Sequence, residues 1–362
     1  MRKAGGLGCV ALVLAATAAG PVPPEAVILY EAACLSCRQG DPDLAASYLL
    51  RAIGAGFADV SHLRRDPELR ALRDHPVFSA ILAARDAADG RLAHRRLERW
   101  RERYPAYRCE IDEPARISYL TALDETAQKR MRRMLDDLAV HLTRSLFEAM
   151  PAHGVLIAIP TEADAARILD DPHIHGRYTH PTRQLIARDA GRSLRHEFVH
   201  VLHQGHMDRL GQQHPPWVQE GLASLYEEYR LGPEGTIEFP PNDRDVFATD
   251  LLNGGKLLSW PELFSLSSKH LSSEARRAYP QLRSIFRFLA SWGKLEAFYR
   301  SFVDGFDEEP AAIGALQRTF GQPIDRLESR WRRWLAEPRP EADERTESPI
   351  ARRADAEAPE NG

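Results

Sequence analysis

The residues with the clearest chemical potential are two histidines and a glutamate in one short segment. His196, Glu197 and His200 form an H-E-x-x-H pattern inside an apolar run, Leu194 to Leu202, with helical spacing. Residues four apart on a helix lie on one face, so both imidazoles can meet one metal ion while Glu197 lies beside it. Because imidazole is a common zinc ligand, the pattern predicts a zinc site with a carboxylate next to it.

A catalytic zinc site needs a third protein ligand, and the sequence offers two candidates. His206 follows His200 by six residues, which is the metzincin spacing. However, His203 stands where that pattern has a glycine, and no methionine follows Met207 to form a methionine turn. The other candidate, Glu220, lies one turn into a second predicted helix that opens at a proline-rich turn. A glutamate at that position can face the first helix, so Glu220 competes with His206 for the role of third ligand.

The context of Glu220 carries a resemblance to a known family. Nineteen residues separate it from His200, and it stands in a P-x-W-x-x-E-G-x-A segment. This arrangement resembles the peptidase MA-like gluzincins, and the resemblance extends over roughly residues 108–336. It implies that His196, His200 and Glu220 bind Zn²⁺, and that Glu197 acts as general base toward the attacking water.

The same resemblance suggests further roles around the metal. Aminopeptidase-type gluzincins carry a tyrosine at a similar distance beyond the glutamate ligand, which implies that Tyr279 stabilises the tetrahedral intermediate. His203 lies on the face of His196 and is expected either to line the cleft or to sit on its solvated rim. In thermolysin-like enzymes an aspartate orients a ligand histidine, and Ser224 occupies its place here. The sequence therefore does not identify the group that orients the histidine.

The chain before the metal segment predicts an exported, repeat-bearing protein. Arg2 and Lys3 precede an apolar run that ends in small residues, which is typical of a secretory signal peptide and predicts a secreted or periplasmic protein without a membrane span after signal removal. Six small or apolar residues follow the spacing of one tetratricopeptide (TPR) repeat, which implies a protein partner. They are Leu29, Ala33, Gly40, Ala45, Leu49 and Ala52. Cys34 and Cys37 are expected to be small core positions on its first helix.

The predicted fold class is α+β and mainly helical, with a zincin-like catalytic domain of a small sheet plus helices behind an α-helical TPR-like module. Strands are expected near 117–120, 155–159 and 184–187, with a long helix over 125–150 between the first two. The expected organisation is a signal peptide (1–19), a TPR-like module (20–85), a charged linker helix (86–107), the peptidase domain (108–336) and a disordered tail (337–362).

Composition excludes some functions and leaves others open. The 48 basic and 52 acidic residues give a net charge of −4, so we expect no nucleic-acid partner.

The primary hypothesis is a zinc peptidase acting on a peptide or protein. We expect an endopeptidase because no G-x-M-E-N segment is present to anchor a substrate amine, although Glu162 or Asp189 could supply such an anchor. The alternative is a secreted TPR-like binding or scaffold protein whose zinc site is inactive or acts on a non-peptide bond.

Overall fold

The computed structural model describes residues 23–57, 60–232 and 236–337. The predicted signal peptide lies outside these ranges, and so does the predicted tail apart from Glu337. The described chain is mainly helical with a small mixed sheet, which confirms the α+β class. Its described residues form two compact units, which are divided after His214. None of the described helices combines the length and apolar character needed to cross a membrane.

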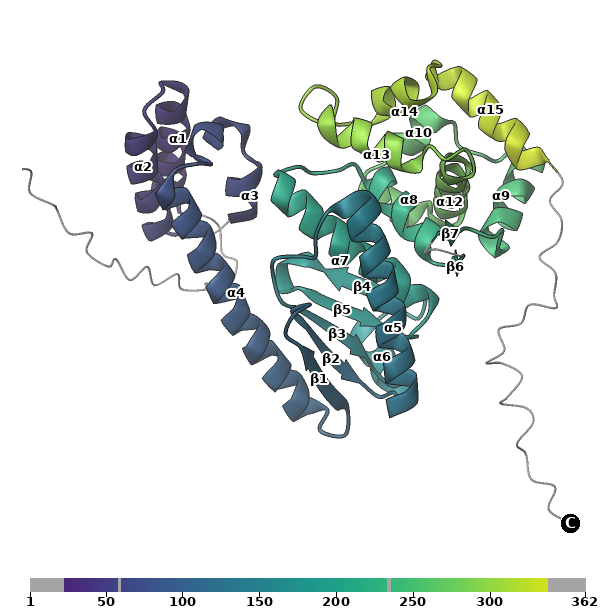
Figure 1. The fold of residues 1–362 in the computed structure, drawn as a ribbon, viewed down its shortest axis with the longest axis horizontal. Helices are drawn as coiled ribbons and strands as arrows, with labels where there is room; N and C mark the ends of the chain where they lie inside the picture. The colour runs from purple at the N-terminus through teal and green to yellow at the C-terminus, as the bar shows by residue number, and fades with distance from the viewer. Residues whose placement is uncertain (1–22, 58–59, 233–235, 338–362) are drawn as a thin grey trace, which may run out of the picture. The chain divides into compact units, whose positions relative to one another are not determined.

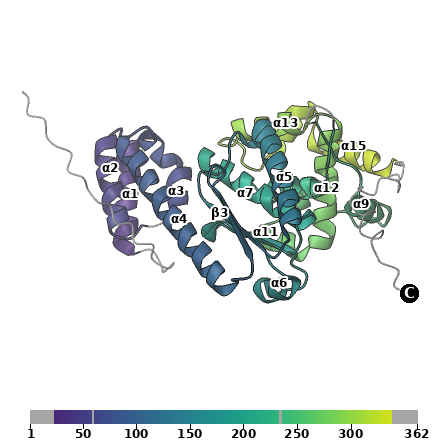
Figure 2. The same cartoon turned by 60° about the horizontal axis from the view of Figure 1, so that its bottom comes forward.

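The first unit begins with short helices that lie together in both ribbon views (Figure 1, Figure 2). Their buried side chains form one apolar core. These are α1 (Pro24–Arg38), α2 (Pro42–Gly54), α3 (Val60–Arg65) and the 3₁₀ helix η1 (Pro67–Leu72). Small side chains such as Ala33 and Ala45 are fully buried and allow α1 and α2 to pack closely. Cys34 and Cys37 are buried on α1 as free thiols, which confirms their predicted core positions.

A single helix, α4 (Pro76–Arg103), crosses the boundary predicted between the repeat module and the linker at residue 85. It starts with a proline in its first turn and with the His75 ring accepting from the backbone N–H of Val77 at 3.2 Å. Near its C-terminal end, Leu97 packs against the sheet. The change in charge density near residue 86 therefore marks no break in the helix.

The sheet has five strands in the order β1-β2-β3-β5-β4. They are β1 (Arg108–Asp112), β2 (Ile117–Thr121), β3 (Val155–Ile159), β4 (Gly176–Thr179) and β5 (Gln184–Ala187). Strands β2, β3 and β5 are parallel and match the three predicted strands, whereas β1 and β4 run antiparallel at the edges and were not predicted. Every residue of β3 is buried, as expected for a strand covered on both faces.

Helices α5 (Glu125–Leu142), α6 (Glu162–Leu169) and α7 (Arg192–Leu210) complete this unit. The helix predicted over 125–150 is too long, because α5 ends at Leu142 and gives way to a short π-helical segment, η2 (Thr143–Phe147). There the hydroxyls of Thr143 and Ser145 donate to backbone carbonyls four residues earlier, which competes with regular α-helical bonding. Glu148 then adopts a φ of 63°, which ends the helical run.

In the residues that the structure describes, the regular elements of the second unit are helices and a two-stranded ribbon of β6 (Arg230–Leu231) and β7 (Ile237–Glu238). Its helices are α8 (Pro216–Tyr226), α9 (Asp243–Asn253), α10 (Trp260–Phe264), α11 (Ser268–Ser273), α12 (Ala275–Ser291), α13 (Leu295–Asp304), α14 (Ile313–Phe320) and α15 (Ile324–Ala336). Trp217, Trp260 and Trp331 are fully buried and form much of its core. Helix α12 packs against both α8 and α9.

Candidate metal centre

Helix α7 carries the H-E-x-x-H segment and is fixed at both ends. The Asp189 carboxylate accepts from the backbone N–H groups of Gly191 at 2.7 Å and Ser193 at 3.3 Å, before and within the first turn. At the other end Gly211 has a φ of 66° and donates to the Met207 carbonyl. The helix follows directly on β5, so the sheet determines where its first turns lie.

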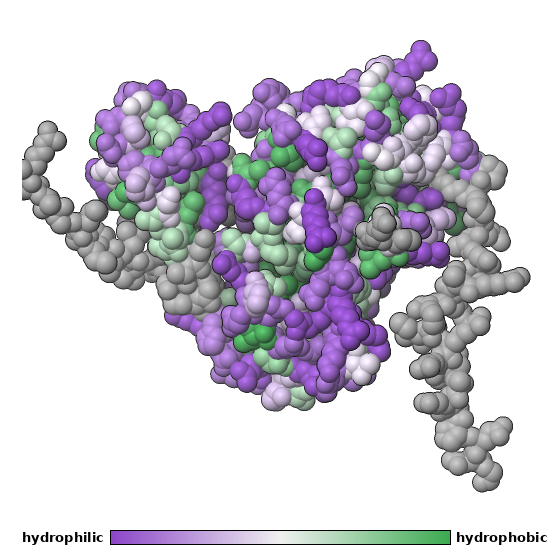
Figure 3. Space-filling model, viewed as in Figure 1, coloured by the Kyte–Doolittle hydropathy of each residue, from purple (hydrophilic) through white to green (hydrophobic). Residues whose placement is uncertain are grey.

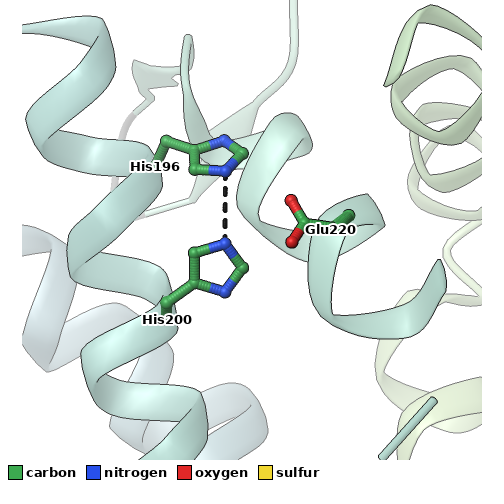
Figure 4. A group of neighbouring side chains, drawn as sticks. All are labelled: His196, His200 and Glu220. Carbon is green, nitrogen blue, oxygen red and sulfur yellow. Dashed lines mark hydrogen bonds between the residues drawn. The ribbon is translucent and has the colours of Figure 1, made fainter. Parts of the chain in front are cut away.

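The three predicted zinc ligands come together. One ligand atom from each of His196, His200 and Glu220 lies within 4.8 Å of the other two, and all three residues are partly buried. The Nε2 atoms of the two histidines are 3.2 Å apart, with their rings at 71°. Figure 4 shows both rings and the carboxylate pointing toward one another, and its dashed line marks a hydrogen bond that the two imidazoles can form.

This donor set fits zinc. Two nitrogens at about 2.0–2.1 Å from a tetrahedral zinc lie roughly 3.3–3.4 Å from each other, and the 3.2 Å between the His196 and His200 nitrogens is close to that separation. Two imidazoles and one carboxylate leave a fourth position open, as in catalytic rather than structural zinc sites.

The helix that carries Glu220 is built on an apolar face. Helix α8 begins with Pro216 in its first turn, and Trp217 and Val218 are fully buried. The Trp217 ring stacks on Phe264 with centroids 4.0 Å apart, and its indole N–H donates to the Ala311 carbonyl at 3.1 Å. This packing anchors the first turn of α8, and Glu220 follows directly after that turn.

Glu197 is held by the edge strand β4. Its Oε2 atom accepts a hydrogen bond of 2.8 Å from the backbone N–H of Tyr178. Gly176, on the same strand, approaches so closely that a Cβ there would lie 2.7 Å from the Glu197 Cγ. The strand therefore determines the position of the predicted general base.

Strand β4 is in turn tied back to α7 by groups that the sequence did not indicate. The Tyr178 hydroxyl and His180 Nδ1 are 3.2 Å apart, and His180 Nε2 lies 3.2 Å from the Asp208 carboxylate in the last turns of α7. Burial raises the pKa of Tyr178 to about 12. Although burial opposes ionisation of Asp208, the adjacent His180 imidazole and the positive charge of Arg183 lower its pKa overall.

The histidines outside the H-E-x-x-H segment have other surroundings. His203 is fully buried, so the expectation that it lies on a solvated rim is wrong; its ring stacks on Phe147, and its Nε2 is 2.7 Å from His214 Nδ1. His206, the metzincin candidate, is also buried, with its Nδ1 3.0 Å from the Phe147 carbonyl. Burial lowers the pKa of His206 to about 4 and that of His214 to about 3, so both are neutral near pH 7.

The remaining predicted residues are placed as follows. Tyr279 lies on α12, with the Arg244 guanidinium 5.5 Å from its ring centroid. Ser224 is buried near the end of α8. Glu162 and Asp189 line one cavity of about 440 Å³. Both are engaged, because Glu162 pairs with Arg188 at 2.6 Å and Asp189 caps α7.

A second group of potential ligands is formed by Cys34, Asp66 and Glu68. One ligand atom of each residue lies within 4.8 Å of the other two. Asp66 accepts hydrogen bonds from the Tyr30 hydroxyl and from the Glu68 backbone N–H. Burial raises the pKa of the Cys34 thiol to about 12, which disfavours the thiolate that a metal needs. We interpret this group as a structural connection between α1 and η1.

Comparison with protein-family profiles, curated proteins and solved structures found no match to the chain.

Proposed function

We propose that the protein is a zinc-dependent peptidase of the gluzincin type. The observation that carries the proposal is the convergence of His196, His200 and Glu220, with the carboxylate of Glu197 held next to them by β4. A structural zinc site has no use for a fixed carboxylate beside an open coordination position, whereas hydrolysis requires one.

The chain's own groups divide the work of hydrolysis. His196, His200 and Glu220 would hold zinc, which would polarise the scissile carbonyl as a Lewis acid and lower the pKa of water. Glu197 accepts a proton from the attacking water as the new C–O bond forms, and transfers it to the amine nitrogen when the C–N bond breaks. The Tyr178 N–H keeps the Glu197 carboxylate in place through these steps. Tyr279 is the proposed donor to the oxyanion.

The position of Tyr279 on α12 supports that role. Tyr279 precedes Arg283 by four residues and Phe286 by seven, so the three side chains lie on one face of the helix. Arg283 and Phe286 both contact α8, which carries Glu220. The phenol is therefore on the side of α12 that faces the helix of the third ligand.

A peptide substrate and internal cleavage fit the surroundings of Glu197. Strand β4 is the last strand in the sheet order, and an edge strand can pair with an extended peptide through backbone hydrogen bonds. Both carboxylates that could have served as an amine anchor, Glu162 and Asp189, have partners within their own unit. We therefore propose an endopeptidase. We also propose that the fold combines a TPR-like module of α1 and α2 with a zincin-like domain that follows it in the sequence. We propose that the protein is exported.

The alternative function, binding of a protein partner with an inactive zinc site, is favoured by one observation. Helix α1 exposes Val27, Ile28 and Leu35, with 68% of the Ile28 surface accessible. Green, hydrophobic areas are visible among the hydrophilic surface of these N-terminal helices (Figure 3). Such side chains suit an apolar helical segment of another protein.

Profiling purified protein against a peptide library, with and without a chelator, tests the peptidase proposal. We expect cleavage of internal peptide bonds that stops on chelation and returns when zinc is added. Cleavage that persists in the metal-free protein would contradict a metal mechanism. Full zinc occupancy without cleavage of any peptide would favour the binding function.

A further inference from the structure

The residue after the third ligand is in exceptionally close contact with a neighbouring helix. A Cβ built on Gly221 would lie 2.1 Å from Cε2 and 2.3 Å from Cδ2 of Phe286. Ordinary carbon contacts begin at about 3.4 Å, so any side chain at position 221 must move α8 and α12 apart or displace the ring. The Phe286 ring is fully buried and therefore has little room to move.

The C-terminal end of α8 is held by the same helix. Arg283, whose side chain is fully buried, donates to the carbonyls of Ser224 and Leu225, each at 2.7 Å. These carbonyls belong to the last turn of α8, where no intrahelical N–H is available to them. The guanidinium also pairs with Asp245 of α9 at 3.3 Å, so its own position is fixed.

Because Arg283 and Phe286 are three residues apart, they form two anchor points on one face of α12. Phe286 contacts α8 beside Glu220, and Arg283 holds the C-terminal end. Helix α8 can therefore neither slide along α12 nor tilt away from it without losing one of the two contacts. The Glu220 backbone directly precedes Gly221, the residue that Phe286 contacts.

We propose that Phe286 is a positioning residue for the metal ligand Glu220, and that Gly221 is required because only a glycine lets α8 pack directly on that ring. This inference depends on the proposed zinc site. Metal–ligand distances tolerate only about 0.2 Å of error, whereas an alanine at 221 falls short of ordinary contact with Phe286 by more than 1 Å. The carboxylate would consequently be displaced from the two imidazoles.

The test is a pair of substitutions that separates the clash between a side chain at 221 and the Phe286 ring from other effects of the substitution. Gly221→Ala should lower zinc affinity about 10- to 100-fold, the range found when groups that orient a ligand are changed. Phe286→Leu removes the atoms that the new methyl group would meet, so the double variant should recover most of the lost affinity. Gly54→Ala is the control, since Gly54 also lies in a helix but a Cβ there meets nothing within 4 Å.

Zinc affinity is measured by competition with a chromogenic chelator, and the absorption spectrum of the cobalt-substituted protein reports the ligand geometry. Helical propensity favours alanine over glycine, so weaker binding cannot be attributed to a less stable α8 helix. Wild-type affinity in Gly221→Ala, or a loss that Phe286→Leu does not recover, would overturn the inference. If Gly221→Ala fails to fold, the double variant decides: zinc binding supports the inference, and failure to fold or bind zinc refutes it. Absence of zinc from the wild-type protein would instead refute the proposed function.

Discussion

Replacing Gly176 by alanine should separate catalysis from metal binding. The new Cβ would lie 2.7 Å from the Glu197 Cγ, which is about 0.7 Å short of ordinary contact. The main chain of β4 cannot easily retreat, because Gly176 is paired with Ala187 of β5. Glu197 must therefore move, and its 2.8 Å hydrogen bond from the Tyr178 N–H must lengthen or break.

The size of the effect follows from this displacement. A misplacement of a catalytic group by about 1 Å costs about 10²-fold in rate, so kcat/KM should fall by about that factor in Gly176→Ala. Overpacking typically costs about 1–3 kcal/mol of stability, which leaves room for a folded protein. The zinc content should not change, because the three atoms nearest to the new Cβ all belong to Glu197.

The assay combines kcat/KM on a peptide substrate with zinc content and thermal unfolding. Gly154→Ala is the matched control, since its Cβ would meet the Ala93 Cβ at an ordinary 3.4 Å. Undiminished kcat/KM in zinc-replete Gly176→Ala would refute the argument that β4 positions Glu197. Loss of zinc together with activity would show that the strand acts on the ligands rather than on the base.

Three further predictions follow from the same site and its surroundings. Glu197→Gln should keep its zinc but lose about 10²–10⁴-fold in turnover; unchanged turnover would falsify the general-base role. N-acetylation of a cleaved peptide should leave cleavage intact, and its abolition would reveal an amine anchor. Because burial lowers the folded-state pKa values of His206 and His214 to about 4 and 3, while unfolded histidine titrates near 6.5, stability should be lost as the pH falls below about 6.5, by about 2 kcal/mol per histidine at pH 5. Denaturant unfolding of metal-free protein at pH 7.5 and 5 should therefore show a smaller loss in His214→Gln than in the wild type; an equal loss would contradict this assignment.

The parts of the site that the sequence predicted are those with local signals. The i and i+4 spacing of His196 and His200 is sufficient to place both on one helix face, because helical geometry is local. The approach of Glu220 depends on how α8 packs, and only the resemblance to gluzincins indicated it. The apolar strands β2, β3 and β5 were predicted for a similarly local reason, since their side chains are mostly buried.

The parts that the sequence did not predict depend on contacts between distant segments. Strands β1 and β4 read R-C-E-I-D and G-R-Y-T, and neither has an apolar pattern because each lies at an edge of the sheet. Consequently the hydrogen bond from Tyr178 to Glu197, and the contact of His180 with Asp208, had no signal in sequence spacing. The burial of His203 was missed for the same reason, since its stacking partner Phe147 is more than fifty residues away.

Zinc content tests the central claim most directly, because the account assigns the third ligand to Glu220 and not to His206. Elemental analysis of the purified wild type, Glu220→Ala and His206→Ala should find one zinc per chain in the wild type and in His206→Ala. It should find strongly reduced zinc in Glu220→Ala. Full zinc in Glu220→Ala together with none in His206→Ala would contradict the gluzincin site and support a metzincin-like one.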